Sequence, residues 1–334
     1  VSGNTSSYSD MNAPEGLLYY AIEYSTWILI AAPAMASSCV MNNILRYEGK
    51  AFFAMLGLAS GGILNIFGDM FLIFVLKLGV RGAGISTAVS QYISMAILIS
   101  PFLRGKVQSR LNIRYVTRQF RDVSNILATG FPSLMRQGLN SVSVMVLNRF
   151  AGPYGDAAIA AMSIVTRIIN FLFCVALGIG QGFQPVSAFN YGAGKYHRMR
   201  KSVRVCMAMA YITAFIVSGA IVLFAGSIYR LFTTDQTVVK IGVHMIRFLI
   251  PSYALYVVIG ILSGALRGAG RVLIPMILTC GGVCMIRIIW LFAFVKSHPG
   301  INSIMLSYPV SWVITAVLFV IYYFRRFPGI QKKK

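Results

Sequence analysis

The sequence predicts an all-α membrane protein that crosses the bilayer many times. Of its 334 residues, 57% are apolar and only 11% are charged. Apolar runs of about 20 residues, the length that spans a bilayer as a helix, recur along almost the whole chain. A soluble domain would carry roughly 25% charged residues. The composition therefore excludes a soluble enzyme, a disordered chain and a secreted disulfide-rich scaffold.

Nine apolar runs predict nine transmembrane helices, separated by short polar or basic segments. The predicted spans are 17–44, 52–76, 84–103, 123–148, 157–189, 205–229, 241–265, 272–295 and 301–324. The fifth span is long enough to be tilted, kinked at Pro185 or extended beyond the bilayer.

The distribution of basic residues predicts the orientation of these helices. The chain has 30 Lys and Arg against 8 Asp and Glu, a net charge of +22. Twenty basic residues fall in the C-terminal tail and in the loops after the first, third, fifth and seventh spans, whereas six fall in the opposite loops. Basic loops stay in the cytoplasm, so we expect a plasma or inner membrane protein with its N-terminus outside and its C-terminus inside. Nucleic acid is not an expected partner, because the aromatic residues lie in the spans rather than on a basic face.

An internal repeat with an offset of 221 residues predicts two related halves. The motif Leu-Arg-x-x-Gly-Lys at 45–50 returns as Leu-Arg-x-x-Gly-Arg at 266–271. Further pairs at this offset are Met55 with Met276, Gly61 with Gly282, Phe71 with Phe292, Gly79 with Gly300, and Ser90 with Ser311. Both copies lie between helices of the same orientation, so the repeat is parallel, as in transporters built from two halves.

The repeat also predicts the domain organisation. Shifting the three spans between 123 and 229 back by 221 residues places their partners before Val1, so we expect a twelve-helix molecule that lacks its first three helices here. Residues 1–103 would be the C-terminal half of the first lobe, 104–121 a basic cytoplasmic linker, and 122–334 a complete second lobe with a basic tail. Such a truncated chain is expected to be inactive alone. The alternative is a complete protein with nine spans.

Several ordered motifs, from about Tyr20 to the last span, resemble those of multidrug and toxic compound extrusion (MATE) transporters. They are Gly178-x-Gly180-Gln181-Gly182-Phe183-Gln184-Pro185-Val186, Gly155-Asp156-x-Ala158-x-Ala160-Ala161-Met162, Gly130-Phe131-Pro132, and Asn65-x-x-x-Asp69 followed by Gly82-Ala83-Gly84-x-x-Thr87-x-x-Ser90-Gln91. The resemblance implies a secondary antiporter that exports organic cations or amphiphilic drugs in exchange for Na⁺ or H⁺. We expect no other cofactor, and a monomer whose partners are the small-molecule substrate and membrane lipid.

One polar group in the first half is predicted to bind the coupling cation. Asn65 and Asp69 are one helical turn apart and share a face, and Thr87 in the next span adds a hydroxyl. Carboxylate and amide oxygens suit a hard cation or a relayed proton. The residues at the matching positions of the second half are Ile286, Trp290 and Tyr308. The polar trio therefore belongs to one half only.

The resemblance implies the same site, because the family has an Asn, an Asp and a Thr at these motif positions. One departure is Met70, where the family usually has Pro after the Asp. The alternative is that Asp69 pairs with Lys77 or Arg81 at the outer helix end. Glu23, among aromatic residues near the outer end of its span, is interpreted as a solvated carboxylate at the membrane rim.

Candidates for the substrate cavity lie in the second half, where Arg136, Gln137 and Asn140 form the most polar patch. Arginines inside the spans should face the bundle or extend to the membrane surface; they are Arg136, Arg167, Arg247 and Arg287. They leave open an alternative function, a lipid or lipid-linked oligosaccharide flippase, which needs a cationic cavity. The spans of 123–324 contain no acidic residue, so no second cation site is expected.

Neither catalysis nor metal binding is expected. A membrane-embedded enzyme needs a catalytic cluster such as His with Asp or paired carboxylates, and the spans contain none. Cys280 and Cys284 are one helical turn apart, but no His, Asp or Glu lies within ten residues of them. Because a structural metal site usually has four ligands, these cysteines are interpreted as packing residues.

Overall fold

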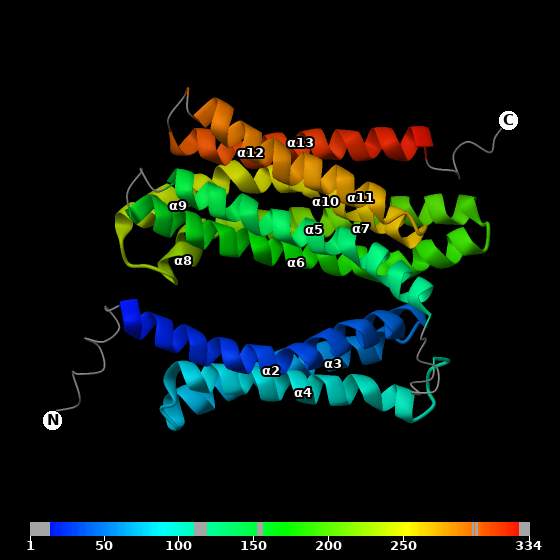
Figure 1. The fold of residues 1–334 in the computed structure, drawn as a ribbon. Helices are drawn as coiled ribbons and strands as arrows, with labels where there is room; N and C mark the ends of the chain where they lie inside the picture. Colours follow the sequence, from blue (N-terminus) through cyan, green and yellow to red (C-terminus); the bar gives the residue numbers. More distant parts are fainter. Residues whose placement is uncertain (1–13, 110–118, 152–155, 296, 298–299, 327–334) are drawn as a thin grey trace. The chain divides into compact units, whose positions relative to one another are not determined.

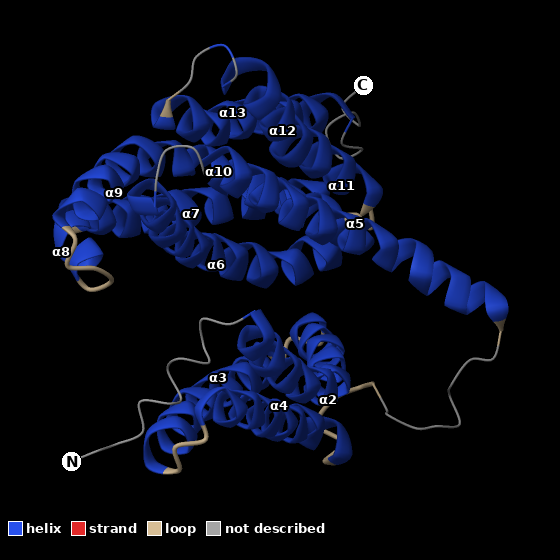
Figure 2. Ribbon diagram, turned by 60° about the vertical axis from the view of Figure 1, so that its left-hand side comes forward, coloured by secondary structure: helices blue, strands red, loops and turns tan. Residues whose placement is uncertain are grey.

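A computed structural model of the chain describes residues 14–109, 119–151, 156–295, 297 and 300–326. These residues are almost entirely helical and form no β-strand (Figures 1 and 2). The chain divides into two compact units, 1–116 and 117–334. The division falls inside the segment predicted as the linker, 104–121. The centre of that segment, 110–118, and the tail, 327–334, lie outside the described residues.

The first unit is a packed group of three helical segments (Figure 1, blue to cyan). They are α2 (Pro14–Tyr47), α3 (Ala51–Met70) with its π-helical continuation η2 (Phe71–Val75), and α4 (Gly79–Leu103). Helix α4 packs against both α2 and α3. Small residues allow the close approach: a β-carbon at Gly84 would lie 2.9 Å from Cβ of Trp27. This use of small residues is typical of helix packing in membranes.

The second unit has six helical segments and one short helix. The uninterrupted helices are α5 (Phe120–Ala151), α6 (Asp156–Gly192), α7 (Tyr196–Leu223), the short α8 (Ala225–Arg230) and α13 (Ile301–Arg326). The segment between α8 and α11 consists of α9 (Gln236–Leu249), η5 (Ile250–Ser252) and α10 (Tyr253–Gly268). The segment before α13 consists of α11 (Leu273–Thr279), η6 (Cys280–Met285), α12 (Ile286–Trp290) and η7 (Leu291–Val295). Its core lies where α10 packs against α6, α7 and α13. Gly180 of α6 lies at this contact, since a β-carbon at Gly264 would come 3.1 Å from its carbonyl oxygen.

Eight helical segments of the described residues are long and apolar enough to cross a membrane. This confirms a multi-pass membrane protein, with one difference from the nine predicted spans. Helix α5 forms where the fourth span is predicted but is not among the eight. Its polar residues lower its hydropathy, and Arg136, Gln137 and Asn140 are among them.

The predicted boundaries of the sixth span are wrong. The prediction was 205–229, whereas α7 begins at Tyr196, ends at Leu223 and is followed by the separate helix α8. The reason is that an apolar run marks only the part of a helix that suits the bilayer. Lys and Arg are good helix formers, so the basic segment assigned to a loop instead forms the first turns of α7.

The internal repeat is visible in the structure of each unit. Gly49 and Gly270 end their helices with φ of +76° and +77°. In both turns the next amide donates back to the leucine carbonyl, Lys50 to Leu45 at 2.7 Å and Arg271 to Leu266 at 3.0 Å. The same offset relates two close packing contacts, Gly61 with Ser94 and Gly282 with Thr315. The sequence repeat is therefore a repeat of turn geometry and helix packing.

Glu48, in the turn after α2, holds the end of the first unit in place. Its carboxylate accepts hydrogen bonds from the amides of Gln108, at 2.7 Å, and Ser109, at 2.9 Å, and from the Ser109 hydroxyl. These hydrogen bonds lower the pKa of Glu48 from its ordinary 4.5, and the bond from the Ser109 hydroxyl contributes most. The negative charge therefore fixes the start of the segment that follows α4.

Replacing Glu48 with Ala should lower the hydrogen-exchange protection of the Gln108 and Ser109 amides by about tenfold, as expected for loss of a charge-assisted hydrogen bond. Because the folded pKa is lowered, the wild-type contact is fully present above about pH 4.5 and is lost as the pH falls through the folded pKa. The amide of Lys106, bonded to the Pro101 carbonyl at 3.0 Å, is the internal reference. Equal protection in the variant at pH 7 would contradict the anchoring role of Glu48.

Candidate functional site

The structure brings Asn65, Asp69 and Thr87 together between α3 and α4. The Asn65 amide nitrogen lies 3.4 Å from Oδ1 of Asp69 and 3.3 Å from Oγ1 of Thr87. It also lies 3.3 Å from Oγ of Ser86, a buried residue that the sequence interpretation missed. Hydroxyls at 86 and 87 reach the same group because the helix α4 turns by only 100° between adjacent residues. Three oxygens therefore converge on one amide.

This arrangement has the oxygen atoms that a hard cation requires. An amide nitrogen has two protons for these three acceptors, and distances of 3.3–3.4 Å are long for hydrogen bonds. The two ends of an Asn side chain are assigned from such networks rather than observed. Turning the amide over would add its carbonyl oxygen to the other three. The cluster can then offer four oxygens, one of them charged, to Na⁺, or a carboxylate to a proton.

Asp69 has no ion pair among the residues that the structure describes. Arg81, one of the two basic partners considered for it, instead approaches Glu23, with 3.7 Å between Arg81 Nε and Glu23 Oε1. The interpretation of Glu23 as a solvated carboxylate is therefore wrong: its side chain is only 22% exposed and faces an arginine. The sequence could not show this because the two residues lie on different helices, 58 positions apart.

The helix that carries Asp69 changes its geometry directly after the site. Helix α3 ends at Met70, and the next five residues form the π-helix η2. A π-helical turn is rare and occurs often at functional sites, since it leaves backbone groups out of the regular ladder. Met70, the position at which the chain departs from the family pattern, therefore lies where the regular α-helix ends.

A cavity of about 310 Å³ lies inside the second unit, and Arg136, Gln137 and Asn140 all line it. Further lining residues that the sequence interpretation missed are aromatic: Phe173, Tyr253, Tyr256, Tyr308 and Trp312. They come from three helices, α6, α10 and α13, so no single stretch of sequence indicates the whole cavity. The available local signal was the spacing of Tyr253 and Tyr256, which places both on one face of α10.

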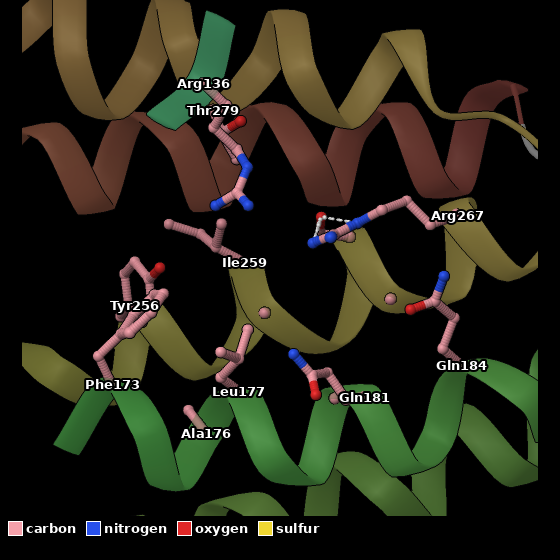
Figure 3. Close-up of a pocket in the computed structure, with 14 residues that line it drawn as sticks. Arg136, Phe173, Ala176, Leu177, Gln181, Gln184, Tyr256, Ile259, Arg267 and Thr279 are labelled. Carbon is pink, nitrogen blue, oxygen red and sulfur yellow. Dashed lines mark hydrogen bonds between the residues drawn. The ribbon is translucent and has the colours of Figure 1, made fainter. Parts of the chain in front are cut away.

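A second, smaller cavity of about 40 Å³ shares Arg136, Phe173, Tyr256 and Thr279 with the first. The guanidinium groups of Arg136 and Arg267 both point into it, opposite Gln181 of α6 (Figure 3). Arg267 was assigned to a loop, but it lies in the last turn of α10 and donates to the Ser263 hydroxyl at 2.8 and 3.2 Å. Arg167 and Arg247, by contrast, are exposed on α6 and α9.

Arg287 is the most buried charged residue of those described, with 4% of its surface exposed. It lines the larger cavity. Its guanidinium carbon lies 4.0 Å from the centre of the Tyr308 ring, a cation–π contact. Its Nε is buried and has no hydrogen-bond partner among the described residues. The two cavities together therefore have three arginines and no acidic residue in their linings.

Comparison with known proteins finds similarity to one transporter family. Residues 132–292 match the family described as MatE. The multidrug export protein MepA of Staphylococcus haemolyticus is 28% identical over 313 residues, which is 92% of this chain and 68% of that protein. MepA of Staphylococcus aureus (strain NCTC 8325) is 26% identical over 248 residues, 74% of this chain and 55% of that protein.

Solved structures share the fold. The outward-facing conformation of a multidrug resistance MATE family transporter of the MOP superfamily has a TM-score of 0.86 at 24% identity, covering 93% of this chain and 70% of that chain. A MOP superfamily transporter from Pyrococcus furiosus, described as having a binding pocket of reverse polarity, has a TM-score of 0.88 at 23% identity, covering 96% of this chain and 73% of that chain. The match to MatE, the multidrug export relatives and the shared fold support a MATE family efflux transporter rather than an enzyme.

Proposed function

We propose that the protein is a multidrug efflux antiporter that exports organic cations or amphiphilic drugs in exchange for Na⁺ or H⁺. Its relatives of 26–28% identity are multidrug export proteins. The function needs no cofactor other than the coupling ion. We further propose that it acts as a monomer, with the N-terminus of this chain outside and the C-terminus in the cytoplasm, in contact with membrane lipid and with no nucleic acid.

The convergence of oxygens at Asn65, Asp69 and Thr87 carries this proposal. An ionisable group inside a membrane span costs several kcal/mol unless it has a purpose or a partner. Asp69 has no basic partner among the described residues, and the Asn65 amide that it contacts also reaches the hydroxyls of Ser86 and Thr87. A cation or proton that binds there in only one state of the transporter would shift the equilibrium between its states.

A second candidate function is a flippase for lipids or lipid-linked oligosaccharides. It is favoured by the arginines that line the cavities of the second unit. A flippase would not require a coupling cation at Asp69, so the two functions differ in their dependence on an ion gradient.

The test is efflux of ethidium from cells that express the protein and lack their own major exporters. Cells are loaded with ethidium, de-energised and then given an imposed Na⁺ or H⁺ gradient. The proposal expects efflux driven by one of these gradients and abolished when that gradient is collapsed by an ionophore. Efflux that persists at the same rate without either gradient would contradict antiport.

A further inference from the structure

We infer that the second unit binds an amphiphilic anion. In this inference Arg136 and Arg287 hold one oxyanion group, a carboxylate or phosphate, and the aromatic walls of the larger cavity hold an apolar or aromatic body. The site goes beyond the proposed coupling of a cation at Asp69. If the protein is an exporter as proposed, the site would add amphiphilic anions to the organic cations among its substrates.

The charge of the cavity carries the first step. Arg136 and Arg287 line it, whereas none of its lining residues is acidic. Its remaining polar side chains are neutral amides and hydroxyls, including those of Gln137, Asn140 and Thr279. Two guanidinium groups without a carboxylate in a confined cavity make a positive potential that favours an anion.

The state of Arg287 carries the second step. Burying a charged group without a partner costs free energy. Arg287 is nevertheless only 4% exposed, and its Nε has no hydrogen-bond partner among the described residues. The cation–π contact with Tyr308 offsets only part of this cost. An oxyanion can accept from a guanidinium in a planar, two-bond geometry. A bound anion would therefore satisfy the buried group.

The internal repeat carries the third step. Tyr308 lies at the repeat position of Thr87, and Thr87 belongs to the oxygen cluster of the first unit. In the second unit the guanidinium of Arg287 lies over the side chain at this position, 4.0 Å from the centre of the Tyr308 ring. In the first unit, Thr87 therefore lies among oxygen atoms that could bind a cation from solution. In the second unit, the positive charge at the matching position belongs to the protein itself, to Arg287, and such a charge favours an anionic ligand.

The walls and size of the cavity indicate the rest of the ligand. Phe173, Tyr253, Tyr256 and Trp312 supply aromatic surface. Tyr256 packs against Phe173 and Trp312, with ring centres 5.5 and 5.6 Å apart. The volume of about 310 Å³ lies at the lower end of the range of small-molecule sites. A body of two or three fused rings with one anionic group fits these dimensions.

The test compares two probes with the same ring system and opposite charge, anthracene-9-carboxylate and 9-(aminomethyl)anthracene. Binding is titrated by calorimetry to the purified chain in phosphatidylcholine nanodiscs, with empty nanodiscs as the blank. We expect the carboxylate to bind at least about tenfold more tightly than the amine. Arg136→Gln and Arg287→Gln should each weaken carboxylate binding by about 10- to 100-fold, the effect of one lost charge-assisted hydrogen bond.

The control is Arg247→Gln, which removes an exposed arginine of α9 that lines neither cavity. It should leave carboxylate binding unchanged. Because Arg287 is buried, its replacement can impair folding. Carboxylate binding by the Arg136→Gln variant is therefore the decisive measurement, since Arg136 is only half-buried. Equal affinity for the two probes, or unchanged carboxylate binding in Arg136→Gln, would overturn the inference.

Native mass spectrometry separates the two sources of the anion. An anionic phospholipid retained by the wild-type chain and by Arg247→Gln, but lost from Arg136→Gln, would support the site and identify a lipid headgroup as its occupant. Probe binding without a retained lipid would support the site for a free amphiphilic anion. These binding results do not depend on an ion gradient, so a failure of the efflux test would leave them intact, and the reverse also holds.

Discussion

Asp69→Asn should reduce gradient-driven ethidium efflux to the level of cells without the gene. The substitution keeps the size of the side chain and one oxygen acceptor, but it removes the charge that attracts a cation and the group that accepts a proton. If no group binds the ion more tightly in one conformation of the transporter than in the other, an ion gradient cannot shift the equilibrium between these conformations. The measurement is the initial efflux rate after the gradient is imposed, in cells with equal amounts of protein in the membrane.

A matched control is Asp235→Asn, the same chemical change outside the site. Asp235 is the N-cap of α9 and accepts the amide of Thr237 at 2.8 Å. Because Asn is as good an N-cap as Asp, this variant should transport at the wild-type rate. Gradient-driven efflux that is unchanged in Asp69→Asn would exclude Asp69 as the coupling residue. Equal loss of efflux in both variants would point to a general effect of losing negative charge.

The positions of the helices were largely predictable because a bilayer sets the length and composition of a span. The apolar runs could not show where a helix continues beyond the run, as at the basic start of α7, or ends inside it, as at Leu223. The polar helix α5 shows the opposite case: a helix of the expected length whose composition differs from a lipid-facing span, with polar residues that line a cavity.

The candidate site was predictable to the extent that it is local in sequence. Asn65 and Asp69 share a helical face, and the motif around Thr87 places it on the neighbouring helix. The structure puts Oδ1 of Asp69 and Oγ1 of Thr87 within 3.4 Å of the Asn65 nitrogen. The cavity of the second unit was not predictable as a whole. Arg287 contacts Tyr308 across two helices, and such contacts depend on how the helices pack rather than on any spacing along the chain.

Gly242→Ala should destabilise the second unit by about 1–5 kcal/mol. Gly242 lies on α9 against the ring of Tyr229 from α8, and a β-carbon there would overlap the ring. Tyr229 has no exposed surface, and its hydroxyl donates to the carbonyl of Ala161 at 2.9 Å. The ring can move only by losing that buried hydrogen bond. Overpacking costs about 1–3 kcal/mol and an unsatisfied buried hydroxyl about 1–3 kcal/mol, against about 1 kcal/mol gained from helix propensity.

The measurement is the midpoint of thermal unfolding in detergent, together with the fraction of protein that remains monodisperse. Gly219→Ala is the control, because Gly219 lies in α7 and no atom would come within 4 Å of its added β-carbon. That variant should be neutral or more stable by up to about 1 kcal/mol. The loss in Gly242→Ala should shrink when Tyr229 is also replaced with Ala, since the two changes act on one contact and are not additive. Additive losses in the double variant would show that Gly242 acts elsewhere than on the Tyr229 ring.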